Sequence, residues 1–148
     1  MKQKMATIKR RKSKLWAIWG WIFPRANMKD VVIALRNTIW IDKDLDRDTI
    51  SINLIAHEQE HLAQQKAVGW FLWLLFYVFS PMTRYLLELK AYTRQIRFLT
   101  GTKAEVVLAR KKFASIMASE MYCTRWELFF GKRMVKYNRA CSDLAKAL

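Results

Sequence analysis

Apolar residues recur at helical spacing along most of the chain. Ile52, Ile55 and Leu62 fall on one side of such a helix, which is predicted to run over about 49–68 with Asp48 as its N-cap. Residues 70–79 are apolar on every side, which is typical of a helix that is buried or lies at a membrane interface.

Two further helix starts are marked by capping residues. Ser80-Pro81 joins a cap to a proline at the first helical position and predicts a helix to about Leu99. Thr102–Glu105 matches a capping box and opens another long helix. A break near Gly131 and a final helix to Leu148 are expected to follow. The inward side of the helix after Thr102 is predicted to hold Val106, Leu108, Phe113, Ile116 and Met117.

Strands are predicted only before the first of these helices. Val31–Leu35 and Thr38–Ile41 are short runs of β-branched or aromatic residues bounded by turn residues. Residues 1–14 are predicted to be a disordered basic arm. The fold class is therefore mostly α (α+β), with a short β edge and a single domain over residues 15–148.

The charge of the chain is large and uneven. The net charge is +15, yet residues 30–61 carry seven acidic and three basic side chains, whereas residues 1–29 carry nine basic side chains and no acidic one. Such basicity predicts a polyanionic partner, namely nucleic acid, anionic lipid or cell wall, bound in part through the basic arm. Nonspecific stickiness is the alternative.

The segment Leu15–Phe23 is apolar and rich in tryptophan. It is short for a signal peptide and lacks a small-residue cleavage site, so export is not expected. It is expected either to cover the core or to contact a membrane surface peripherally. The longest apolar run, Val68–Phe79, is too short to span a bilayer. Cys123 and Cys141 fit no zinc spacing and are expected to be free thiols, which suits a reducing cytoplasm.

Both histidines of the chain lie in one pentad, His57-Glu58-Gln59-Glu60-His61. Imidazoles at i and i+4 share one face of a helix and can reach a single tetrahedral zinc ion, while Glu58 can face the open fourth position. The alternative is a helix whose two histidines pair with carboxylates or pack in the core.

A catalytic zinc site needs a third protein ligand, and no other histidine exists to supply it. Gln64 and Ala67 stand where the extended metzincin motif requires glycine and histidine, so that reading fails. Glu88, in the middle of the helix that starts at Pro81, is the best carboxylate candidate. The alternative for Glu88 is an ordinary i,i+4 pair with Arg84 on the helix surface.

These residues resemble the gluzincin branch of zinc metallopeptidases, with Glu88–Ala91 as the E-x-x-A form of the third-ligand helix. The stretch from about Asn37 to Leu99 is also similar to small, poorly characterised H-E-x-x-H proteins of bacteria and their phages. The shared features are Asn37–Trp40, His57–Gln64, Gly69–Phe71, the Ser-Pro turn and Glu88–Tyr92. The resemblance covers less than half of the chain.

The resemblance implies a minimal zincin-like domain with a metal-site core at about 37–99, to which the predicted helices at 102–148 add a helical extension outside the resemblance. It implies that His57, His61 and Glu88 bind Zn2+ and that Glu58 is the general base of a zinc metallopeptidase acting on a peptide or protein substrate. The protein is then expected to be cytoplasmic, or virion-associated if phage-encoded.

The resemblance also assigns supporting roles. An extended substrate would pair with the strand formed by Thr38, Ile39, Trp40 and Ile41. Larger gluzincins often place an aspartate at the position of Tyr92, so Asn53, one turn before His57, is the possible substitute that orients a zinc histidine. Tyr85 or Tyr92 could stabilise an oxyanion, although core packing suits each of them as well.

Another function class remains open at this point. Basic side chains alternate with aromatic ones beyond residue 110, which suits single-stranded nucleic acid or phosphate backbones. The alternative function is therefore a nucleic-acid- or membrane-associated binding protein whose zinc site is not catalytic. A cell-wall amidase is a third possibility. The residues of this basic and aromatic set are Arg110, Lys111, Lys112, Tyr122, Trp126, Phe129, Phe130, Lys132, Arg133, Lys136, Tyr137 and Arg139.

Overall fold

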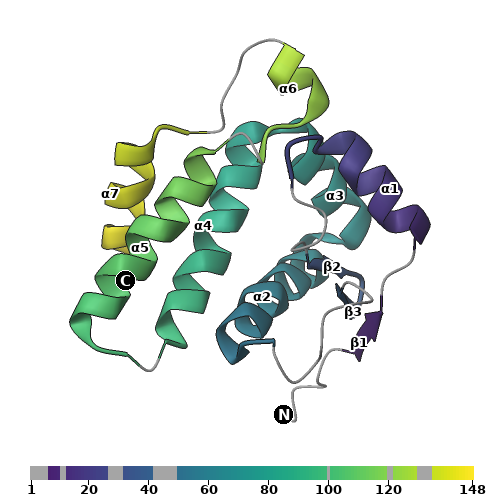
Figure 1. Cartoon of the computed structure of the whole chain (residues 1–148). Helices are drawn as coiled ribbons and strands as arrows, with labels where there is room; N and C mark the ends of the chain where they lie inside the picture. The colour runs from purple at the N-terminus through teal and green to yellow at the C-terminus, as the bar shows by residue number, and fades with distance from the viewer. Residues whose placement is uncertain are drawn as a thin grey trace.

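Helices dominate the structure, a computed structural model that describes residues 7–10, 13–26, 32–41, 50–99, 101–119, 122–129 and 135–148. The predicted fold class, mostly α with a small sheet, is confirmed (Figure 1). In chain order the elements are β1 (Thr7–Arg10), α1 (Ser13–Ile22), β2 (Ile33–Leu35), β3 (Thr38–Ile41), α2 (Ile52–Val68), α3 (Trp70–Phe79), α4 (Pro81–Arg97), α5 (Lys103–Ala118), α6 (Arg125–Phe129) and α7 (Tyr137–Ala147).

Capping residues set the helix boundaries largely as predicted. The Ser80 hydroxyl accepts a hydrogen bond from the backbone N–H of Thr83, and Thr102 and Glu105 form a complete capping box. Between α2 and α3, Gly69 has φ 85°, a left-handed conformation that favours glycine. The start of α2 differs from the prediction, because its N-cap is Ser51. Asp48 and Gly131 lie outside the described residues.

The C-terminal helices form a core with one side of α4. Tyr85, Tyr92 and Ile96 of α4 pack with α5 and α7 in one buried cluster. The prediction that Leu108 faces inward is wrong, since its side chain is 68% exposed. Leu108 lies off the stripe of α5 that contains Phe113 and Met117. The other members of the cluster are Phe113, Ala114, Met117, Val135, Ala140 and Leu144.

The sheet corrects two predictions. Its order is β1-β3-β2, with β1 parallel and β2 antiparallel to β3. Thr7–Arg10, predicted to belong to a disordered arm, instead pairs with Thr38–Ile41, and residues 13 and 14 start α1; residues 1–6, 11 and 12 lie outside the described part. Because β3 is hydrogen-bonded on both sides, it is not an edge strand, and an extended substrate has no free ladder there.

The tryptophan-rich segment covers the core. Trp16 and Phe23 are buried, and the Trp19 ring stacks on Tyr77 of α3 at a centroid distance of 5.9 Å. Trp21 on the other side of α1 is exposed. No helix within the described ranges is long and apolar enough to cross a membrane.

Helix α2 lies between the sheet and the other long helices (Figure 1). One side packs against α4, and the opposite side packs against β2. The Gln65 amide fastens the second contact, because its nitrogen donates to the Ala34 carbonyl at 2.8 Å and its oxygen accepts from the Arg36 N–H at 2.8 Å. The pentad therefore sits in the middle of the protein.

Candidate metal centre

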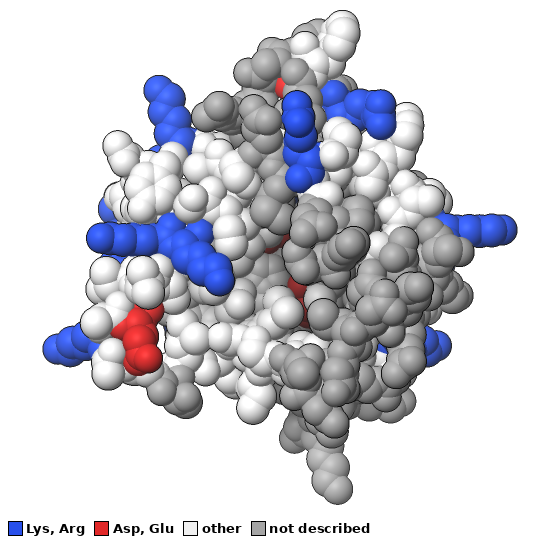
Figure 2. Space-filling view, viewed as in Figure 1, with Lys and Arg blue, Asp and Glu red and all other residues white. Residues whose placement is uncertain are grey.

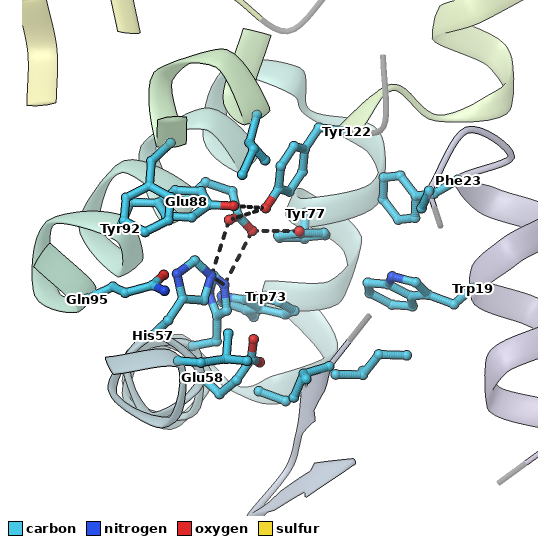
Figure 3. Close-up of a pocket in the computed structure, with 18 of the residues that line it drawn as sticks. Trp19, Phe23, His57, Glu58, Trp73, Tyr77, Glu88, Tyr92, Gln95 and Tyr122 are labelled. Carbon is cyan, nitrogen blue, oxygen red and sulfur yellow. Dashed lines mark hydrogen bonds and ion pairs between the residues drawn. The ribbon is translucent and has the colours of Figure 1, made fainter. Parts of the chain in front are cut away.

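Three buried side chains from two helices meet in the space between α2 and α4. His57 of α2 points toward Glu88 of α4 (Figure 3), and His61 lies one helical turn after His57. His57, His61 and Glu88 are 5%, 5% and 1% exposed. The two histidine Nε2 atoms are 3.2 Å apart. Glu88 lies 3.4 Å from His57 Nε2 through one oxygen and 3.3 Å from His61 Nε2 through the other. The group could hold a metal ion.

The alternative prediction for Glu88, a surface pair with Arg84, is wrong. Arg84 is fully buried and binds Glu127 of α6 instead of Glu88. The sequence-based expectation that Glu88 returns to the level of the two histidines is confirmed by the geometry. Helices α2 and α4, which α3 connects, bring the three residues together.

The donor atoms are close enough together to hold one metal ion. One ligand atom from each of the three residues lies within 4.8 Å of the other two. Zinc binds imidazole nitrogen and carboxylate oxygen at about 2.0–2.2 Å, so neighbouring ligand atoms in a zinc site lie about 3.3 Å apart. The 3.2 Å between the two Nε2 atoms matches that value, while the 3.3 and 3.4 Å distances run to different oxygens of Glu88.

Charge in the group is strongly coupled. Burial raises the pKa of Glu88, but the two imidazoles outweigh burial and hold that pKa well below its ordinary value. Burial lowers the pKa of His61, but the adjacent Glu88 carboxylate outweighs it and raises the pKa to about 9. Without a metal ion, a proton on His61 therefore offsets the negative charge of Glu88. A bound cation would offset the same charge.

Tyrosine hydroxyls fix the Glu88 carboxylate. Tyr77 donates to one oxygen at 2.6 Å and Tyr122 donates to the other at 3.0 Å (Figure 3). Tyr92 in turn bonds the Tyr122 hydroxyl at 2.6 Å. Burial raises the pKa of Tyr77 and of Tyr122 well above the ordinary value, so both remain neutral donors.

Sequence reasoning missed two of these residues. Tyr77 is the single hydroxyl on an apolar helix, four residues after Trp73, and that position on the inward stripe was a usable signal. Tyr122 follows α5 in a segment without periodicity and was grouped with the basic, aromatic surface. Its placement beside Glu88 removes it from that surface.

Gln64 orients His61 from behind. Its side-chain oxygen lies 3.0 Å from His61 Nδ1 and also accepts from Trp73 Nε1 at 3.2 Å. Its nitrogen donates to the Leu87 carbonyl at 3.0 Å. An acceptor at Nδ1 places a proton there and leaves Nε2 as the ligand atom.

The predicted role of Asn53 is not observed. Asn53 Oδ1 and His57 Nδ1 are both buried, and neither has a hydrogen-bond partner among the described residues. The Tyr92 ring lies edge-on to His57 at 4.5 Å and restrains the imidazole by packing instead. The two histidines of the pair are thus oriented by different means.

Glu58 faces the sheet rather than Glu88. It is buried, and its carboxylate interacts with the backbone N–H of Ala34 in β2. Burial raises its pKa, and Glu88 adds to the rise, although the imidazoles and the Ala34 N–H oppose it. Glu58 and the metal group line one cavity of about 390 Å³. Acidic side chains are visible at the bottom of a hollow in the middle of the face shown in Figure 2.

The residues that line the cavity distinguish between Tyr85 and Tyr92, and between β2 and β3, as parts of the site. Tyr92 lines it, and so do Val32, Ile33 and Ala34 at β2, whereas the β3 residues are not among its lining residues. Tyr85, the other possible oxyanion residue, does not line the cavity: it packs in the core, the alternative expected for it, and its hydroxyl donates to Asp143 in α7 at 2.5 Å. Trp19, Phe23 and Trp73 form an aromatic end of the cavity, as Figure 3 shows.

Comparisons of the chain with protein-family models, curated proteins and solved structures gave no match. The site is therefore interpreted from its own geometry.

Replacing Tyr77 by phenylalanine is expected to weaken metal binding by about 10–100-fold, because Glu88 loses a donor that orients it. Isothermal titration of the metal-free protein with zinc measures this. The matched control is Tyr85→Phe, which removes a buried hydroxyl that does not contact Glu88. Equal affinities in Tyr77→Phe and the unsubstituted protein would contradict the assigned role.

Proposed function

We propose that this protein is a zinc-dependent hydrolase of peptide or protein amide bonds. The observation that carries the proposal is the buried His57, His61 and Glu88 group in a cavity that also contains Glu58. Two imidazoles and one carboxylate are a donor set typical of catalytic zinc. When bound, zinc would lower the pKa of a water molecule and polarise the carbonyl of the substrate.

Opposite pKa shifts support different roles for the two glutamates. Glu88 is held ionised by the imidazoles, as a ligand must be. The raised pKa of Glu58 suits a group that takes a proton from water and returns it to the leaving nitrogen. Tyr92, a neutral phenol at the cavity wall, stays the candidate for stabilising the oxyanion.

The substrate backbone is proposed to lie along β2 instead of β3. Val32–Ala34 line the cavity, and Ala34 is next to Glu58. An extended segment there would lie alongside Glu58 and leave its carboxylate free to contact the water. The aromatic end formed by Trp19, Phe23 and Trp73 would accommodate an apolar side chain of that segment.

A binding protein with a structural zinc site is less well supported. Structural zinc sites are closed by four protein ligands, whereas the described residues supply a group of three beside a cavity. The net charge of +15 still predicts a polyanionic partner, and that partner would be compatible with hydrolysis.

Metal analysis tests the proposal directly. Protein dialysed against zinc and then against buffer is expected to hold about one zinc ion per chain. His57→Ala is expected to hold none under the same conditions, because two ligands remain. Gln95→Ala, which changes a buried cavity residue outside the metal group, is the matched control and should keep its zinc. Unsubstituted protein without zinc would overturn the proposal.

A further inference from the structure

Helix α3 is apolar on two opposite faces. Trp73 and Tyr77 face the cavity, as expected for a helix that packs on a core. The outward side carries no polar group, although the solvent side of such a helix is normally charged or polar. Besides Trp70 at its first position, its exposed residues are Phe71, Leu72, Leu75, Phe76 and Phe79.

The exposed apolar surface continues into α4. Met82 and Leu86 follow Phe79 at spacings of three and seven residues, and both are about half-exposed. Together with the five residues of α3 they form what we call the α3 face. Exposed apolar surfaces of this extent mark interaction sites in folded proteins.

The charges around the α3 face are positive. No acidic residue occurs between Glu60 and Glu88, so the face contains none. The Arg36 guanidinium lies 4.4 Å from the Trp70 ring centroid at the start of α3, and exposed Lys66 and Lys90 flank the face along α2 and α4. Lys and Arg side chains also project around the face shown in Figure 2.

This combination selects the partner. A second copy of the chain would bring two molecules of charge +15 together, and their repulsion disfavours a dimer. The phosphate backbone of a nucleic acid is charged and hydrated and offers no apolar surface for the seven side chains of the α3 face. An anionic bilayer offers both an apolar layer and a negative surface. Ten residues of α3 are too few to span the membrane, so the helix would lie in the plane of its surface.

We propose that the α3 face docks on the surface of a bilayer that contains anionic lipid. Trp73 and Tyr77 would then connect the docked helix to the metal centre from its inner side. Docking does not depend on hydrolysis, since no residue of the α3 face lines the cavity.

Vesicle sedimentation of the full chain tests the proposal. Vesicles of phosphatidylcholine and phosphatidylglycerol in equal parts should bind the protein, and pure phosphatidylcholine should bind it more weakly. The double variant Leu72→Glu/Phe76→Glu should lose at least about tenfold in partitioning, because apolar contacts are lost and charges of the wrong sign are added. Circular dichroism confirms that each variant is folded.

The matched control is Val107→Glu/Leu108→Glu, which makes the same charge change at exposed apolar residues of α5. Helix α5 is separated from α3 by α4 (Figure 1), so partitioning should change by less than about twofold. Equal losses in both double variants would mean that net charge alone drives binding and would overturn the proposal. So would unsubstituted protein that stays in the supernatant, or a dimer in solution that only the α3 variant disrupts.

Discussion

Replacing Glu58 by glutamine is expected to reduce hydrolysis of labelled casein by about 10²–10⁴-fold while zinc stays bound. Glutamine keeps the shape of the side chain but cannot take a proton from water. Glu58 is not part of the buried metal group, so the zinc content should not change. The measurements are the rate at saturating zinc and the metal content of the same sample.

Glu60 provides the control for this substitution. It lies on the same helix two residues later and pairs with Arg94 at 3.1 Å. Glu60→Gln therefore repeats the chemical change outside the cavity and should keep nearly full activity. Full activity in Glu58→Gln would exclude the general-base role, and equal losses in both variants would indicate a nonspecific effect on α2.

The arrangement of His57, His61 and Glu88 was predictable because short stretches of sequence determine it. The i,i+4 spacing of His57 and His61 fixes their common face, and Ser80-Pro81 fixes where the return helix begins. Once Glu88 is placed on that helix, the choice of third ligand follows from the absence of other histidines. Each of these steps depends on a short stretch of sequence.

The hydrogen-bonding partners of the group depend on long-range packing. Tyr122 reaches Glu88 from a segment 34 residues away, with no periodic pattern to announce it. The Asn53 prediction was wrong because helical proximity to His57 was not accompanied by a suitable side-chain geometry. For His61, the Gln64 side chain supplies the orienting hydrogen bond.

The prediction for the first strand was wrong for a different reason. Thr7–Arg10 contains two basic residues, and the charge of the surrounding segment made it look like an arm. Only the alternation around Ile8 and the pairing with β3 show that it is a strand. Because this pairing fills one side of β3, the predicted substrate strand had to move to β2.

A buried ion pair one helical turn from Glu88 carries the largest expected stability effect. Arg84 donates to both oxygens of Glu127 and to the backbone carbonyls of Tyr77 and Val78. Glu127 also accepts from the Thr124 N–H and hydroxyl. Arg84 thereby joins the end of α3 to α6 across α4.

Glu127→Ala is expected to lower the free energy of unfolding by about 3–5 kcal/mol, because it leaves the Arg84 charge buried without a counter-ion. Urea unfolding of the zinc-free protein measures it. Glu105→Ala is the control, since it removes an exposed capping carboxylate that no buried charge depends on, and should cost clearly less. The double variant Arg84→Met/Glu127→Leu should recover much of the loss, as apolar replacements of buried pairs often do. A loss in Glu127→Ala no greater than in Glu105→Ala would show that Arg84 finds water or another acceptor.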